Sequence, residues 1–145
     1  MRKRELRPHA ISGAVGAGLA VGFDEVLKAK HPGQRLTLYA ALLVGAAAVY
    51  PLARRRGRTS GHGLLELAGL GAYGSVGVLA ARRKAPSAGS LIATGWASHA
   101  IFDLLHHSSS EDSMIPDWYP AFCAGYDLTL AALLRGSIST EPSRP

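Results

Sequence analysis

The stretch LTLYAALLVGAAAVYPLA, residues 36–53, decides how this chain must fold. Its only polar side chains are Thr37, Tyr39 and Tyr50. A helix in a soluble bundle needs polar positions every three or four residues to face water, and this stretch offers no such face. About twenty apolar residues in a helix span the hydrocarbon core of a bilayer. The stretch therefore predicts a transmembrane helix.

Further apolar blocks of about the same length lie at residues 64–81 and 88–105, and basic or Gly/Pro-containing segments separate the blocks. Working outward from residues 36–53, we predict an all-α fold: a polytopic integral membrane helical bundle with five transmembrane helices and short polar tails. The expected helices cover about 9–29, 36–54, 62–82, 88–107 and 118–135. The alternative is four spans, with a first helix that is re-entrant or interfacial.

The basic residues, which give a net charge of +6, gather in RKR (2–4), RRRGR (54–58) and RRK (82–84), each beside an apolar block. This placement is typical of topology anchors near anionic head groups. We therefore predict the lipid bilayer, and no nucleic acid, as the partner, and the cell membrane as the location. Five spans would divide the positive charges evenly between the two sides, so the orientation stays open.

The N-terminal segment has the pattern of a signal peptide, with basic residues 2–4 before the apolar run 11–23. The glycines in this run weaken that interpretation and suit close helix packing, with Gly18 and Gly22 at GxxxG spacing. We expect a retained helix. Near its end, Asp24 and Lys28 are four apart, which favours an interfacial salt bridge.

The segment SHAIFDLLHH, residues 98–107, places ionisable groups in an apolar block. Because helical residues advance by 100°, His99, Asp103 and His106 share one face. This spacing directs nitrogen and oxygen donors to one side, as a metal ion requires. Ionisable residues in a membrane span are costly, so they are expected to face the bundle interior and to find partners there.

Two other predicted helices add polar groups of the same kind. His62 and Glu66 begin the third, and Asp127 lies in the fifth on a face shared with Cys123. With alternating directions these groups would meet near one membrane face. We predict His99, Asp103, His106 and His62 as metal ligands and Glu66 and Asp127 as catalytic residues. The cofactor would be a divalent ion, with zinc, iron and manganese all compatible.

Three functions remain open at this point. The first is a metal-dependent membrane enzyme, a hydrolase or oxidoreductase, that acts on a lipid-phase substrate. The second is a proton- or metal-ion-handling transporter or channel subunit, for which a homo-oligomer would supply the passage. The third is a structural role in which the polar cluster only packs helices. The apolar run LTLAALL after Asp127 indicates a closed path and favours a one-sided site.

In residue types, the intramembrane histidines and aspartates resemble those of membrane-embedded zinc hydrolases of the alkaline ceramidase type. The resemblance implies a metal held by His and Asp, and neither a fold nor a substrate is carried over. The acidic connection at residues 106–120 is interpreted as a hydrated turn, with a lid above the site as the alternative.

Overall fold

The computed structural model describes residues 3–54, 60–106 and 114–139, with backbone alone at residues 3–8 and 85. Within these ranges the regular structure is entirely helical, which confirms the all-α prediction. The elements are α1 (Lys3–Lys30), the short 3₁₀ helix η1 (Pro32–Gln34), α2 (Arg35–Ala53), α3 (Gly61–Ala81), α4 (Ala85–His106) and α5 (Tyr119–Ser139).

The predicted helix boundaries differ from the observed ones mainly at the two ends of the chain. α1 begins at Lys3, so Pro8 lies within the helix rather than in its first turn, and α5 continues four residues beyond the expected end, to Ser139. α1 is one unbroken helix of 28 residues, so its backbone contains no turn of the kind that a re-entrant segment requires.

The residues at the helix ends explain where α2 stops and α3 starts. Pro51 lies in the last turn of α2, where the Arg54 backbone N–H donates to the Tyr50 carbonyl, and the chain turns extended at Arg54. Ser60 caps α3, since its hydroxyl accepts a hydrogen bond of 3.3 Å from the Gly63 backbone N–H.

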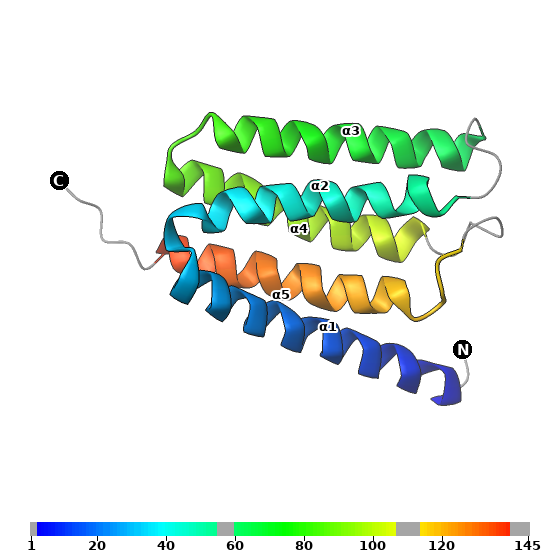
Figure 1. Ribbon diagram of the computed structural model, residues 1–145. Coiled ribbons are helices and arrows are strands. Elements are labelled where there is room, and N and C mark those ends of the chain that lie inside the picture. Colours follow the sequence, from blue (N-terminus) through cyan, green and yellow to red (C-terminus); the bar gives the residue numbers. More distant parts are fainter. Residues whose placement is uncertain (1–2, 55–59, 107–113, 140–145) are drawn as a thin grey trace.

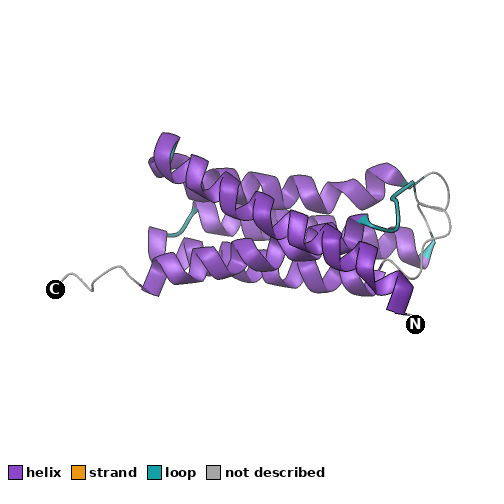
Figure 2. Cartoon of the chain, turned by 90° about the horizontal axis from the view of Figure 1, so that it is seen from below, coloured by secondary structure: helices purple, strands orange, loops and turns teal. Residues whose placement is uncertain are grey.

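Successive long helices run in opposite directions, and α1 lies beside α5, which runs parallel to it (Figure 1). α5 also packs against α4, while α2, α3 and α4 contact one another. The end of α2, the start of α3, the end of α4 and the start of α5 therefore lie at one end of the bundle (Figures 1 and 2). We call this the α3-start end, and the other end the α2-start end.

Glycines bring α1 and α5 into close contact. A Cβ atom at Gly16 would overlap the Phe122 backbone, and one at Gly125 would overlap the Gly13 backbone. Gly18 and Gly22, which the GxxxG spacing singled out, have open space at their Cβ positions. The prediction that glycines of this run allow close packing is confirmed at Gly13 and Gly16, and it is wrong for Gly18 and Gly22, which lie on the exposed side of α1.

The side chains are distributed differently from those of a soluble bundle, because apolar residues cover the outside and ionisable residues lie inside beside an apolar core. Large apolar residues such as Leu52 and Leu105, each 72% exposed, cover the outside. Buried inside are the polar residues Asp24, Arg54, Glu66, His99, Asp103, His106 and Asp127. The segments His9–Lys30, Pro32–Ala53 and Gly61–Ala81 are each long and apolar enough to cross a membrane. These features indicate membrane insertion.

Candidate metal centre and its neighbouring polar clusters

The buried polar residues form three clusters along the bundle. The central cluster is His99, Asp103 and Asp127, from α4 and α5. The Arg54 cluster joins Arg54, Glu66 and His106 at the α3-start end. The Asp24 cluster joins Asp24, Lys28, Arg35 and Tyr39 at the α2-start end.

In the central cluster, one imidazole faces two carboxylates. His99 Nδ1 lies 2.8 Å from Asp127 Oδ2 and 3.4 Å from Asp103 Oδ2. His99 and Asp103 are four residues apart on α4, which places them one above the other on the same face. Asp127 reaches them because α5 packs along α4. Each of the three residues is at most 1% exposed.

Asp103 is the unusual member of this group. Both of its carboxylate oxygens are buried, and neither has a hydrogen-bond partner among the described residues; the same holds for His99 Nε2. Buried polar atoms are nearly always hydrogen-bonded, because the interior does not replace the water that they lose. The donors nearest to this fully buried carboxylate are His99 Nδ1, at 3.4 Å, and the Tyr50 hydroxyl and Cys123 thiol, none of which makes a close hydrogen bond with it, so an additional partner would stabilise it.

A divalent metal ion fits this need in geometry and in charge. One donor atom from each of the three residues lies within 4.8 Å of the others. Ligand atoms at about 2.0–2.2 Å from one ion are themselves about 2.8–3.6 Å apart, and the 2.8 and 3.4 Å separations fall in this range. Two carboxylates and a neutral imidazole carry two negative charges, which a divalent cation neutralises.

Aromatic rings surround the imidazole of His99. The Tyr73 ring from α3 lies edge-on with its centroid 5.0 Å away, and the Trp96 ring lies at 6.4 Å. The Phe102 ring lies at 6.3 Å, on the side towards the α3-start end. Cys123, one turn before Asp127 on α5, is buried at 7% exposure. The centre is therefore enclosed by protein rather than open to solvent.

The Arg54 cluster holds the other ionisable residues that the sequence assigned to the same site. Arg54 donates through Nε and Nη2 to the two oxygens of Glu66, at 2.7 and 2.5 Å. His106 Nε2 lies 2.7 Å from Glu66 Oε1, and the His62 ring lies 5.9 Å from that of His106. Glu66 thus binds both His106 and Arg54, an arginine that the sequence indicated only as a topology anchor.

The structure thus divides the predicted set of six residues in two. His99 and His106 share a helical face but are seven residues apart, which is about 10 Å along the axis. The Phe102 ring stacks on His106 with its centroid 5.0 Å away, and it stands between the two histidines. One ion at the central cluster is therefore within reach of His99, Asp103 and Asp127. Glu66, His62 and His106 lie farther along the bundle, towards the α3-start end.

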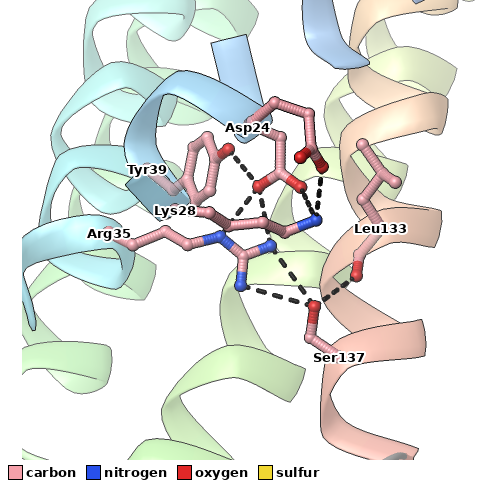
Figure 3. A network of polar contacts seen from close by, with 7 residues as sticks. Asp24, Lys28, Arg35, Tyr39, Leu133 and Ser137 are labelled. Carbon is pink, nitrogen blue, oxygen red and sulfur yellow. Dashed lines mark hydrogen bonds and ion pairs between the residues drawn. The ribbon is translucent and has the colours of Figure 1, made fainter. Parts of the chain in front are cut away.

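The Asp24 cluster lies at the α2-start end (Figure 3). Arg35 binds Asp24 Oδ1 through Nε at 2.8 Å and Nη2 at 2.7 Å, and the Tyr39 hydroxyl donates to the same oxygen at 2.6 Å. Lys28 Nζ lies 2.9 Å from Oδ2, which confirms the predicted pair. Asp24 was expected at the membrane interface, but it is fully buried. Arg35 and Tyr39 of α2 also bind its carboxylate, and they stabilise the buried charge.

An apolar layer separates the Asp24 cluster from the central cluster. Leu43, Ile92, Leu130 and Leu134 belong to this layer, each at most 1% exposed, and Trp96 and Tyr126 pack in the same core cluster. From Asp127 to Leu134 the layer occupies two turns of α5, which is about 10 Å.

Other expectations fall on residues 55–59 and 107–113, which lie outside the described residues. These include His107 and most of the acidic connection with its possible lid. No protein-family model, curated protein or solved structure matches the chain. Its function must therefore be inferred from the chemistry of the described residues.

Proposed function

We propose that this chain is an integral membrane protein of five spans that holds one divalent metal ion at His99, Asp103 and Asp127, and that it acts as a metal-dependent enzyme on a substrate from the lipid phase. The observation that carries the proposal is Asp103: a fully buried carboxylate without a hydrogen-bond partner among the described residues, beside His99 and Asp127. A cation between these groups would offset the cost of their burial.

The dimensions and outer faces of α4 and α5 support five spans. The two helices have 22 and 21 residues, which is about 31–33 Å at 1.5 Å per residue and matches a hydrocarbon core of about 30 Å. Their outward residues include large apolar ones, such as Ile101 and Leu128 (57% and 49% exposed), beside the small polar residues Ser90 and Thr94. The aspartates Asp103 and Asp127 face inward, so they lower the mean hydropathy of the two helices without contacting lipid, while the exposed Arg135 lies in the last turns of α5.

Span number has a direct test. Five spans place the two termini on opposite sides of the membrane, whereas four spans place them on the same side. Epitope tags at the N- and C-termini, probed in sealed right-side-out vesicles before and after permeabilisation, should differ in accessibility. Equal accessibility of the two tags would contradict five spans.

The number of protein donors favours catalysis over a purely structural ion. Structural zinc sites have four protein ligands, whereas catalytic sites have three and keep a position for water or substrate. The described residues offer three donors. When bound, the ion would lower the pKa of a water ligand and so supply a nucleophile for hydrolysis. Because the donors are enclosed, the surrounding rings of Tyr73, Trp96 and Phe102 must shift to admit a substrate.

The deciding experiment is elemental mass spectrometry of detergent-purified protein prepared without chelators. We expect about one zinc, iron or manganese ion per chain, lost in His99→Ala and Asp103→Asn. Asp24→Asn is the matched control, since it changes another fully buried aspartate whose partners are Lys28, Arg35 and Tyr39. Zinc would direct activity assays to lipid hydrolysis, and iron or manganese to lipid oxidation.

Circular dichroism and size-exclusion chromatography should show that the variants keep their helical content and a single oligomeric state. Metal-free wild-type protein would refute the centre and leave structural packing of polar groups as the better account. Equal metal loss in Asp24→Asn and Asp103→Asn would also refute it, because the loss would then follow from general destabilisation.

Transport of protons or metal ions has one observation in its favour, the buried Asp24 cluster at the far end of the bundle. A path through the chain would have to cross the apolar layer of Leu43, Ile92, Leu130 and Leu134. Proteoliposomes loaded with a pH-sensitive dye test this candidate. Proton flux above that of empty liposomes, abolished by Asp127→Asn, would favour it over the enzyme.

A further inference from the structure

We infer that Tyr50 of α2 is a positioning residue of the metal centre, whose hydroxyl donates a hydrogen bond to the Asp103 oxygen that is not bound to the ion. This inference rests on the proposed metal centre, to which α2 contributes none of the three donors. Tyr50 is 2% exposed, and its hydroxyl is buried without a hydrogen-bond partner among the described residues. The hydroxyl interacts with the Asp103 carboxylate, but in a geometry that completes no hydrogen bond.

The two groups are complementary. A phenol hydroxyl has one proton to donate, and a carboxylate that binds an ion through one oxygen has a second oxygen left to accept it. Each of these buried atoms costs free energy while it has no partner, and one hydrogen bond removes both costs. His99 Nδ1 is less suited to this role, because it lies closer to Asp127. The Cys123 thiol is also near the Asp103 carboxylate, but thiols are weak donors.

Contacts on two helices fix the position of the Tyr50 ring. On α4 the ring packs edge-on against Phe102 and His106, with centroids 5.9 and 5.2 Å away, and these residues flank Asp103 in the sequence. On α2 the Arg54 backbone N–H donates to the Tyr50 carbonyl, and the Arg54 guanidinium is held by an ion pair with α3. A partner held in this way can orient the Asp103 carboxylate, as hydrogen bonds to metal-binding groups generally do.

The hydroxyl separates positioning from packing. A phenylalanine at residue 50 would keep the ring contacts and would remove a buried donor that has no partner. A purely packing role therefore predicts that Tyr50→Phe changes nothing that depends on the ion. Loss of a hydrogen-bond partner of a metal ligand, in contrast, typically lowers metal affinity by about 10–100-fold.

A titration of metal-stripped, detergent-purified protein with Co²⁺ tests the inference, with affinity measured by competition with a chromophoric chelator. Co²⁺ binds nitrogen and oxygen donors more tightly than Mn²⁺ or Fe²⁺ does, and its visible absorption reports the ligand geometry. Tyr73→Phe is the matched control near the centre: its ring lies 5.0 Å from that of His99, but its hydroxyl interacts with Ser98. Tyr39→Phe is the control on α2, where the hydroxyl binds Asp24.

We expect Tyr50→Phe to weaken Co²⁺ binding by at least about tenfold and to shift the visible absorption band. The metal-free variant should unfold at the wild-type temperature or above it, since it has lost an unsatisfied buried group. Tyr73→Phe should leave affinity and spectrum unchanged. Tyr39→Phe should lower the unfolding temperature of the metal-free protein without changing either, because it removes a formed hydrogen bond.

The outcomes distinguish this inference from the metal centre itself. Wild-type protein that binds no Co²⁺ would overturn both. Wild-type binding that Tyr50→Phe leaves unchanged, or that Tyr73→Phe weakens equally, would overturn the role of Tyr50 and leave the centre standing. Weaker binding by Tyr50→Phe together with a lower unfolding temperature of the metal-free protein would also overturn it, because Tyr50 would then act through packing of the bundle.

Discussion

His99 and Asp127 join α4 to α5 through a contact of 2.8 Å between Nδ1 and Oδ2. The contact leaves the Asp103 carboxylate 3.4 Å from the same nitrogen, with both oxygens buried. One imidazole N–H shared between two buried carboxylates leaves most of the four oxygens without a donor from His99. A single ion can bind all three groups.

The division into two clusters predicts which residues control metal content. Glu66→Gln and His106→Ala should retain about one metal ion per chain, since both residues belong to the Arg54 cluster. Asp127→Asn should lose at least tenfold in metal affinity, measured by competition with a chromophoric chelator. If Glu66→Gln loses the ion as completely as Asp127→Asn does, the six residues act as one site and the division is wrong.

Arg54 and Glu66 should be strongly coupled in stability. Removing either partner leaves a buried charge alone, so Arg54→Leu and Glu66→Leu should each lower the free energy of unfolding by about 3–5 kcal/mol. The double variant should recover most of this loss, because it leaves neither charge buried. Thermal and denaturant unfolding in detergent would measure the cycle, and additive losses in the double variant would contradict the coupling.

The two cations that bind Asp24 should contribute unequally. Arg35, with a side chain 14% exposed, makes two contacts with the carboxylate, whereas the Lys28 side chain is 41% exposed. Arg35→Met should cost about 2–5 kcal/mol, because it removes a largely buried partner. Lys28→Met should cost about 1 kcal/mol or less, as exposed ion pairs usually do. Equal losses in unfolding experiments would show that burial does not determine the difference.

Glycines in α1 offer a test of the contact with α5. Gly16→Ala should destabilise the bundle by about 1–3 kcal/mol, since the new methyl group would overlap the Phe122 backbone. Gly18→Ala is the control: its Cβ position is open, and alanine favours the helix by up to about 1 kcal/mol. Destabilisation by Gly18→Ala, with none by Gly16→Ala, would place the close contact on the other face of α1.

The sequence predicts the helices and much of the central cluster because both depend on local periodicity. Apolar blocks of bilayer length indicate the spans, and the spacing of His99 and Asp103 on one helix brings them together. Asp127 could be included because alternating helix direction sets its level. The partnership of Glu66 with Arg54 could not be predicted, since it depends on how α2 and α3 pack and since arginines after a span usually mark the membrane surface.

A helical wheel also overstates how many residues can meet at one point. It records the angle about the axis and omits the rise, so His99 and His106 fall on one face although about 10 Å separates their levels. The Phe102 ring between them follows from its position on the same helix, but only packing against Tyr50 and His106 determines where it points. The rise of about 1.5 Å per residue, applied to the sequence alone, is enough to assign His99 and His106 to different levels.

The close fit between α1 and α5 also determines the order in which the protein can be assembled. Among the described helices, the ribosome makes α1 before the other four and makes its main neighbour α5 after them. During that interval α1 has no α5 to dock on, yet Asp24 is already able to bind Arg35 and Tyr39, which leave the ribosome shortly after it. The newly synthesised α1 can thus remain in the bilayer, with the Asp24 carboxylate paired, until α5 is made and docks against it.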